Sequence, residues 1–270
     1  MKNKLVAAPY LVWMAIFIVV PLGIVIYYAF TDSYTGAFTL GNIVGLGDYL
    51  HIFGFSILLG AIAAVICLLI GYPMAYAITQ AKERNQRFLV MLIMLPMVMS
   101  FLLRTLAWKA LLMDNGIINN FLGQFGIGPL PLIRNAGAVV LGMVYDFLPF
   151  MIMPLYTSLS KMDRRIIEAA EDLGATKLHV LRRIILPLSV PGIISGVTMV
   201  FVPAVSTFYI SKQLGSADML MVGDVIESQF KTSYNPNFGA AMSLVLMVLI
   251  LISMGIMNKF ADGDSEEMIL

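Results

Sequence analysis

Four residues of types that can bind a cation lie within two apolar stretches of this chain. Arg104 and Trp108 fall in one stretch, and Tyr145 and Asp146 fall in another. A charge buried in an apolar medium is costly, so it pairs with an opposite charge or serves a function. An aromatic ring face attracts an ammonium group by about 0.5–2 kcal/mol. The four residues could line a path for a cation, but we favour a structural ion pair between Arg104 and Asp146, and Trp and Tyr also occur at membrane surfaces for structural reasons.

Residues 161–188 form a basic, polar segment between long apolar stretches, and part of this segment offers a surface that another protein could approach. Ser160 or Asp163 can cap a short helix, on which two consecutive alanines leave one side flat. A glycine then suits the left-handed end of that helix. The plainer alternative is a solvated amphipathic loop. The residues that carry the docking pattern are Glu168, Ala169, Ala170, Gly174, Ile184, Leu186 and Pro187.

Nothing in the sequence resembles a catalytic site or a metal site. There is no glycine-rich phosphate-binding loop with its lysine, so any ATP hydrolysis must come from another chain. His51 and His179 are far apart, and Cys67 is the single cysteine, which excludes a disulfide framework and a cysteine-based metal site. We therefore expect a chain that is not an enzyme and binds no metal.

The composition excludes a soluble globular domain. Of the 270 residues, 60% are hydrophobic and 12% are charged, whereas about 25% are charged in soluble domains. The mean hydropathy is +0.89. Uncharged runs such as 5–31 and 232–258 exceed the roughly 20 residues that cross a bilayer as a helix.

These runs predict an all-α membrane protein, because a helix satisfies its own backbone hydrogen bonds in lipid. We expect one transmembrane domain, residues 1–270, with the first run retained as a span rather than removed as a signal peptide. A short helix at the outer membrane surface is expected within 115–135. The six transmembrane helices are expected near 8–30, 55–80, 88–112, 137–160, 189–211 and 238–259.

The distribution of basic residues predicts the orientation. Twelve Lys and Arg residues, Lys2 among them, fall in segments assigned to the cytoplasm, against Arg134, Lys212 and Lys231 in the opposite loops. Because basic loops stay inside, both termini are expected in the cytoplasm. Two charges within the spans, at positions 104 and 146, then lie at similar depth, roughly 13 Å from the outer surface.

The outer segments are acidic, and Asp224 and Glu227 are candidate contacts for a cationic solute on its way inward. The alternative is that the orientation rule alone depletes outer Lys and Arg, which leaves an acidic surface without a function.

The segment 161–188 resembles the loop of bacterial ABC importer permeases on which the ATPase subunit docks. Glu168-Ala169-Ala170, Gly174 and Ile184-x-Leu186-Pro187 match that family at its spacing. Other segments are similar to spermidine/putrescine permeases, although Asp146 stands where Asn is usual and Leu106 where Tyr is commoner. These segments are Arg104-Thr105-Leu106-Ala107-Trp108, Asp146-Phe147-Leu148-Pro149-Phe150 and Phe201-Val202-Pro203-Ala204.

The resemblance implies a type I ABC importer permease fold in the bacterial inner membrane. It implies a second homologous permease, two ATPase subunits that use ATP and magnesium, and an extracellular polyamine-binding protein as partners, with lipid around the spans. The chain itself would bind no cofactor and no nucleic acid, and would import spermidine or putrescine by alternating access. The alternatives are the same architecture moving an amino acid, sulfate or iron, an ATP-independent channel or secondary carrier, and a structural membrane scaffold.

Overall fold

The structure is a computed structural model, and it describes residues 4–267 of the chain. Residues 1–3 and 268–270 lie outside the described residues, and with them Lys2 and both chain ends that were assigned to the cytoplasm. The described chain consists of helices and loops, with one isolated bridge between Thr31 and Phe38. The all-α prediction is confirmed.

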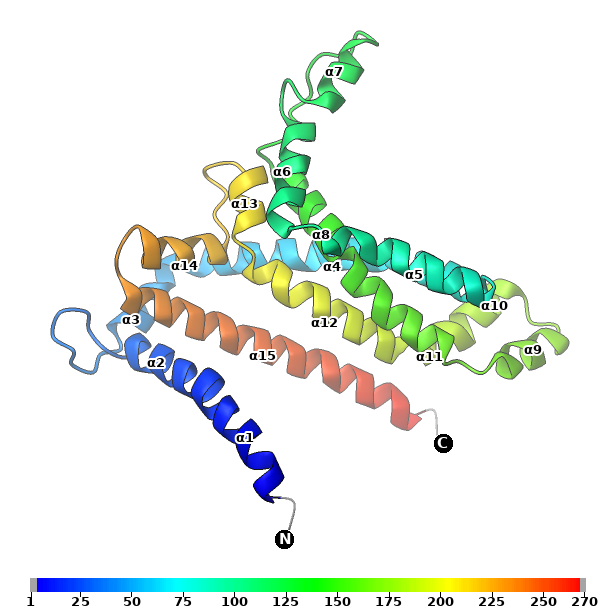
Figure 1. Cartoon of the computed structure of the whole chain (residues 1–270), viewed down its shortest axis with the longest axis horizontal. Helices are drawn as coiled ribbons and strands as arrows, with labels where there is room; N and C mark the ends of the chain where they lie inside the picture. Colours follow the sequence, from blue (N-terminus) through cyan, green and yellow to red (C-terminus); the bar gives the residue numbers. More distant parts are fainter. Residues whose placement is uncertain (1–3, 268–270) are drawn as a thin grey trace.

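The helices follow one another along the chain as labelled in Figure 1. Two π-helical turns (η1 and η3) and one 3-10 turn (η2) join some of them. The elements are α1 (Lys4–Met14), η1 (Ala15–Val19), α2 (Val20–Ala29), α3 (Gly41–Val44), η2 (Gly45–Tyr49), α4 (Leu50–Gln80), α5 (Glu83–Val98), α6 (Phe101–Leu112), α7 (Ile117–Gly123), α8 (Ala136–Ser160), α9 (Arg164–Asp172), α10 (Lys177–Val180), η3 (Leu181–Ile185), α11 (Leu186–Leu188), α12 (Val190–Ser206), α13 (Tyr209–Leu214), α14 (Val222–Lys231) and α15 (Pro236–Glu267).

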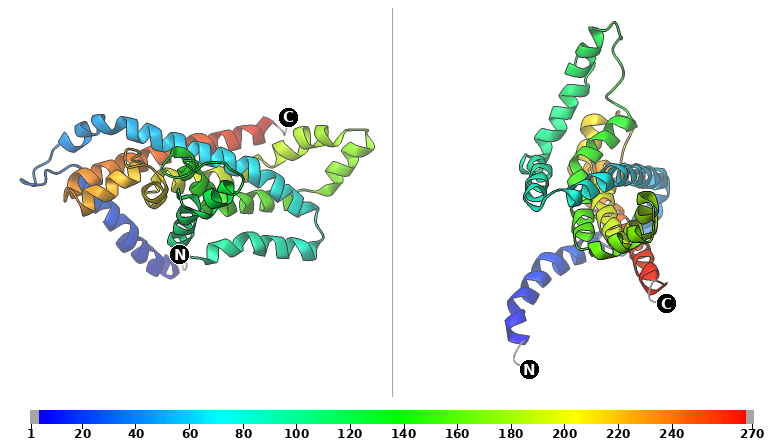
Figure 2. Two further views of the ribbon diagram at one scale, coloured as in Figure 1. Left: turned by 90° about the horizontal axis from the view of Figure 1, so that it is seen from above. Right: turned by 90° about the vertical axis from the view of Figure 1, so that its right-hand side faces the viewer.

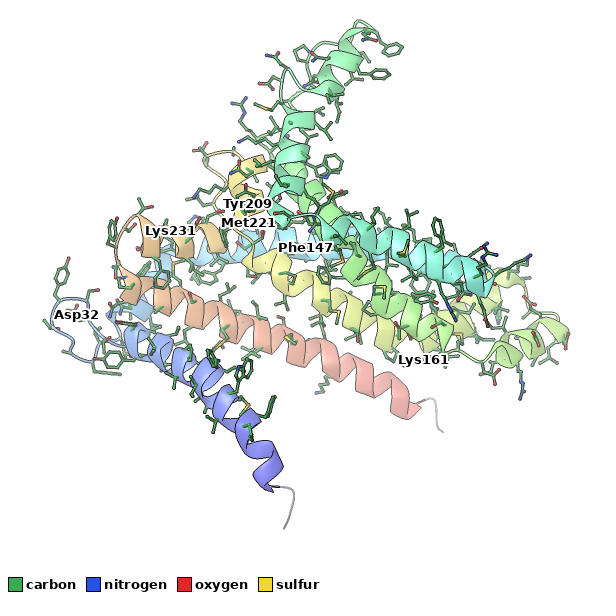
Figure 3. The ribbon with its side chains drawn as sticks, in the orientation of Figure 1. Asp32, Phe147, Lys161, Tyr209, Met221 and Lys231 are labelled. Carbon is green, nitrogen blue, oxygen red and sulfur yellow. The ribbon has the colours of Figure 1, made fainter. Side chains whose placement is uncertain are left out.

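Within the described chain, the helices allow the six predicted spans. Four stretches are long and apolar enough to cross a membrane by themselves, and two bent pairs of helices raise the number to six if each pair forms one span. Figure 3 shows Asp32 and Lys231 toward one end of the long axis and Lys161 toward the other, as alternating crossings require. The four stretches are Pro9–Ala29, Gly41–Gln80, Ala136–Ser160 and Pro236–Met257.

The third span is broken, so the prediction of one continuous helix over 88–112 is wrong. Helix α5 and the stretch Phe101–Gly123, which holds α6 and α7, meet at 86°, because Met99 and Ser100 between them leave the helical conformation with ψ angles of 145° and 131°. Pro96 lies in the last turn of α5 and cannot donate to the helical ladder. In Figure 1, α6 and α7 stand away from the axis of the other helices. Hydropathy could not reveal this break, since no polar run marks it.

Other boundaries also moved. The fifth span was expected to continue to residue 211, but α12 ends at Ser206, where Thr207 is extended with ψ 144°. The second span begins at Leu50 rather than near residue 55. The short helix expected within 115–135 is α7.

The core lies between α4, α8 and α12, which pack against one another along most of their lengths. On α8, Met143, Met151 and Leu155 are completely buried. Cys67 of α4 and Val200 of α12 are buried in the same cluster. These side chains explain why three apolar segments, far apart in the sequence, form one rigid unit.

Two glycines allow α12 to approach α8 closely, as the Gly192-x-x-x-Gly196 spacing indicates. A Cβ atom added at Gly196 would lie 2.7 Å from the Sδ atom and 3.1 Å from the carbonyl oxygen of Met151. At Gly192 it would lie 2.5 Å from the Cβ atom of Ser158. No side chain fits at either position without moving the helices apart.

We expect Gly196→Val to destabilise the protein by about 1–3 kcal/mol, the usual range for overpacking a core. Thermal unfolding of the purified protein in detergent measures this change. Gly54→Val is the matched control, because Gly54 is also helical and a Cβ atom there meets nothing within 4 Å. Equal unfolding temperatures for the two variants would contradict the close packing of α8 and α12.

A second, smaller cluster joins α2, α14 and α15. The side-chain amide of Asn237 donates to the carbonyl oxygens of Thr31 (2.7 Å) and Tyr28 (3.1 Å), which ties the start of α15 to the end of α2. The Val222 amide donates to the hydroxyl of Ser56 at 2.8 Å and so attaches α14 to α4. Beyond this anchor the first span diverges from the bundle, as the right-hand view of Figure 2 shows.

Candidate functional site

Arg104 and Asp146 come together where α6 crosses α8. The Nη1 atom of Arg104 lies 3.0 Å from the Oδ1 atom of Asp146, and their side chains are only 8% and 1% exposed. The guanidinium N–H groups do not point along this line, so the contact is an ion pair without a hydrogen bond between these atoms. The Thr105 hydroxyl donates to Oδ2 of Asp146 at 3.5 Å. Removing one partner would therefore leave a buried charge with little other compensation.

The aromatic candidates lie beside this pair. The rings of Trp108 and Tyr145 are 5.4 Å apart and meet edge to face at 71°. Trp108 is one helical turn beyond Arg104, and Tyr145 is adjacent to Asp146 in the sequence. Both rings are partly exposed, whereas the charged side chains of Arg104 and Asp146 beside them are buried. The bend between α5 and α6 determines this arrangement, because it directs α6 onto α8.

The first half of the 161–188 segment is built from two helix caps. The Asp163 carboxylate accepts a hydrogen bond from the Arg165 amide at 3.0 Å and begins α9. The helix ends at Gly174, whose φ of +83° is the left-handed conformation that glycine adopts most easily. The Gly174 amide donates to the Glu171 carbonyl at 2.9 Å, and the Ala175 amide donates to the Ala170 carbonyl at 3.0 Å. The predicted cap at Asp163 and the left-handed stop are confirmed.

The second half of the segment presents one face to the bundle and another to its surroundings. The Thr176 hydroxyl caps α10 by accepting from the His179 amide at 3.4 Å. Val180 and Ile185 are buried, whereas Leu178 is 56% exposed. Of the residues in the docking pattern, Glu168, Ala169 and Gly174 are exposed, and Ala170, Ile184, Leu186 and Pro187 are partly buried.

One exposed residue of this segment was missed by sequence reasoning. Leu173 at the end of α9 is 90% exposed, although a leucine of an isolated soluble loop gains stability by burial. Leu178 and Ile166 of the same segment are also exposed, at 56% and 46%. Exposed apolar side chains that gather on one segment are available for contact with another protein. The available signal in the sequence was that Leu173 directly precedes Gly174, the glycine that ends α9.

The two outer carboxylates differ in environment. Asp224 is buried and accepts a hydrogen bond from the Met221 amide at 2.9 Å at the start of α14. Burial raises the pKa of Asp224, and the Met221 amide opposes this rise. Glu227 accepts from Lys231 (2.8 Å) and Lys212 (3.2 Å), and the Lys231 hydrogen bond is the main cause of its lowered pKa. All four side chains line a cavity of about 370 Å³, on elements different from those of the Arg104–Asp146 pair.

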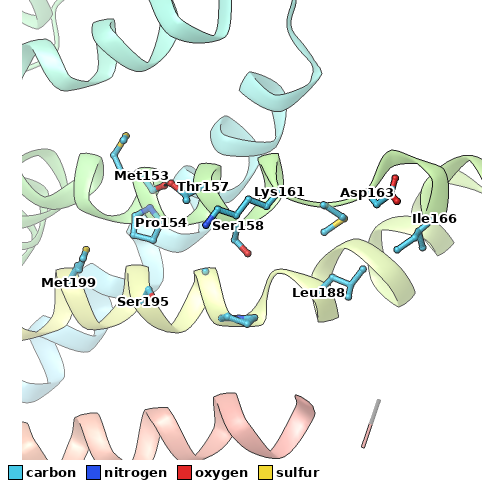
Figure 4. A pocket seen from close by; sticks show the side chains of 13 residues that line it. Met153, Pro154, Thr157, Ser158, Lys161, Asp163, Ile166, Leu188, Ser195 and Met199 are labelled. Atoms are coloured by element: carbon cyan, nitrogen blue, oxygen red, sulfur yellow. Dashed lines mark hydrogen bonds between the residues drawn. The ribbon is translucent and has the colours of Figure 1, made fainter. Parts of the chain in front are cut away.

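A larger groove of about 830 Å³ runs between α8 and α12 toward the end that carries α9 (Figure 4). Its wall carries the hydroxyls of Thr157, Ser158 and Ser195 and the thioethers of Met153 and Met199. Sequence reasoning did not single out these residues. The hydroxyls within otherwise apolar spans were the available signal, but such residues also bond to their own helix backbone, as Thr157 does to the Met153 carbonyl at 2.8 Å.

The arrangement of spans, broken helices and an exposed segment between the fourth and fifth spans agrees with a known family. Residues 68–263 match the family of binding-protein-dependent transport system inner membrane components. The chain belongs to this family. As a member it is a multi-pass protein of the inner membrane.

Individual relatives match over nearly the whole chain. The spermidine/putrescine transport system permease protein PotB of Haemophilus influenzae is 37% identical over 257 residues, which cover 92% of this chain and 90% of that protein. PotB of Escherichia coli is 36% identical over 247 residues, which cover 88% of this chain and 90% of that protein.

A solved structure confirms the fold of type I importer permeases. A chain from a bacterial ABC transporter that imports the acidic polysaccharide alginate superposes with a TM-score of 0.78. The superposition covers 97% of this chain and 96% of that chain, at 17% sequence identity. At this identity the likeness concerns the fold alone.

Proposed function

We propose that this chain is the permease subunit of an ATP-driven ABC importer for spermidine and putrescine. The observation that carries the proposal is the 37% identity to a spermidine/putrescine permease over 92% of the chain. The relative with the alginate importer fold moves an anionic solute, so the fold leaves the solute open and the closer sequence relatives decide it.

The proposed complex contains a second homologous permease, two ATPase subunits and an extracellular polyamine-binding protein. The family description names a binding protein, which supports the last of these. The exposed leucines and the Glu168-Ala169-Ala170 surface of the 161–188 segment support ATPase docking. The groove between α8 and α12 supports a second permease, because it is open to the surroundings and its lining is mainly apolar.

In the proposed mechanism the ATPases close on ATP and magnesium, and the 161–188 segment transfers their motion to the spans. The chain contributes no catalytic group and no cofactor. Its single domain has both termini in the cytoplasm, so α9 faces the ATPases and α14 faces the binding protein. Substrate would pass Asp224 and Glu227 first and then the rings of Trp108 and Tyr145. Because these contacts are few, they bind a cation weakly and allow it to dissociate.

The test of this route is the salt dependence of polyamine uptake in cells that carry the complete complex. Neutralising Asp224 and Glu227 should slow uptake more at low ionic strength than at high, because salt screens the attraction between these carboxylates and an approaching cation beyond about 10 Å at 0.1 M salt. Replacing Trp108 or Tyr145 with Leu should reduce uptake to an extent that salt barely changes.

The solute assignment has its own decisive result. Uptake of an anionic solute by the complete complex, without competition from spermidine or putrescine, would overturn the polyamine proposal and leave the permease assignment intact. Uptake that needs no ATPase subunit would instead favour a channel or a secondary carrier. Asp218→Asn is the control for each single neutralisation, because Asp218 is exposed in the loop that precedes α14 and its loss changes the net charge by the same one unit.

A further inference from the structure

The 161–188 segment joins α12 through a sharp bend. The stretch Lys177–Leu188 and helix α12 meet at 64°, and Ser189 is the residue between them. Pro187 and Pro191 flank the bend, and a proline has no N–H with which to continue a helical ladder. Immediately after the bend, Gly192 packs α12 against α8. The bend therefore connects the 161–188 segment to α12, the helix that is packed against α8.

Ser189 closes the bend with its side chain. It is completely buried, and its hydroxyl donates to the Leu186 carbonyl at 2.9 Å. The same oxygen lies 2.9 Å from the hydroxyl of Tyr72. Because the Ser189 proton is directed to Leu186, the Tyr72 hydroxyl is the donor of the second hydrogen bond. The bend is thus bonded to a helix other than the two that it joins.

Tyr72 belongs to α4 and is held at a rigid point of the core. Its neighbour Gly71 packs on α8, where an added Cβ atom would lie 3.1 Å from the Cγ atom of Met151. The bond from Tyr72 to Ser189 spans 117 positions of the sequence. A partly buried hydrogen bond between two side chains on different helices favours one arrangement of the groups that it joins.

We propose that Tyr72 is a positioning residue for energy coupling, because it holds the bend at Ser189 and links the 161–188 segment to α4. A displacement of the segment then moves α4 together with α12, instead of flexing the bend alone. The inference rests on the proposed function, since it takes the segment to be the ATPase-docking element. The proposal adds Tyr72, a residue outside the 161–188 segment, and assigns to it the transfer of the segment's motion to the spans.

The test is the amount of polyamine imported per ATP hydrolysed by the complete complex in proteoliposomes. Tyr72→Phe and Ser189→Ala each remove the hydrogen bond and should lower this ratio about fivefold, the shift expected for one neutral hydrogen bond. The double variant should lose no more than Ser189→Ala alone, because Tyr72→Phe removes a hydrogen bond that Ser189→Ala already removes. Ser189→Thr keeps a hydroxyl and should restore most of the ratio.

Tyr76→Phe is the matched control. Tyr76 lies one turn further along α4 and is also half-buried, and no hydrogen bond of its hydroxyl is found in the described chain. Membrane abundance and retention of the ATPase subunits should be equal in all variants. A wild-type ratio in both single variants, or additive losses in the double variant, would overturn the proposal.

Hydrogen–deuterium exchange of the complete complex separates this inference from the proposed function. Amides of residues 186–193 should exchange faster in Tyr72→Phe than in Tyr76→Phe, whichever solute the complex imports. Equal exchange in these two variants would overturn the role of Tyr72 even if polyamine uptake is confirmed. Faster exchange in a complex that imports another solute would support the role of Tyr72 and overturn the polyamine assignment.

Discussion

Replacing either Arg104 or Asp146 with leucine should destabilise the protein strongly, and replacing both should restore most of the loss. The two side chains are almost fully buried and 3.0 Å apart. Removing one partner leaves an uncompensated charge in the core, which costs about 3–5 kcal/mol, whereas replacing both with apolar residues is often nearly neutral. Thermal unfolding of the purified variants and their abundance in the membrane measure the effect.

The exposed pair formed by Arg134 and Asp114 provides the control for this experiment. Its charged atoms are 2.9 Å apart, but the side chains are 67% and 57% exposed, so Asp114→Asn should cost at most about 1 kcal/mol. Additive losses in the double variant of the buried pair would show that the two charges act independently. If Asp146→Leu keeps full abundance and loses uptake, Asp146 belongs to the substrate path.

Glu168→Lys should abolish uptake and leave the protein inserted and folded. Glu168 is exposed on α9, so the change affects a surface rather than the packed core of the bundle. Losing a charge that a partner surface pairs with costs about 2–5 kcal/mol of binding, which is more than a tenfold loss of affinity. Copurification of the ATPase subunits and ATP-dependent uptake are the two measurements.

Gly174→Asp tests the same surface through the backbone. The left-handed φ of +83° disfavours a side chain by about 1–2 kcal/mol, but the space around Gly174 is open. The end of α9 should therefore shift without damage to the core.

Asp218→Lys is the control for Glu168→Lys, since it reverses an exposed charge in the loop between α13 and α14. Normal uptake by either Glu168→Lys or Gly174→Asp in an otherwise intact complex would defeat the docking assignment.

Local features of this protein could be predicted from the sequence because they depend on a few neighbouring residues. Asp163, Gly174 and Thr176 end or begin helices through their own side chains or backbone, and such caps need no tertiary contact. The apolar runs predicted the spans for the same reason, since the length of a run is a property of the sequence alone. The Gly192-x-x-x-Gly196 spacing likewise indicated a close helix contact.

Tertiary structure decided which distant residues meet. The 86° bend at Met99 and Ser100 follows from no polar signal, yet it brings Arg104 onto Asp146. Tyr72 looked like one more residue of an apolar span, and only the packing of α4 beside α12 gives its hydroxyl a partner at Ser189. The exposure of Leu173 also required the fold, because hydropathy assigns leucine to the interior. The Tyr72–Ser189 contact joins helices far apart in the sequence, and neither residue has a charge or a motif that would identify its partner.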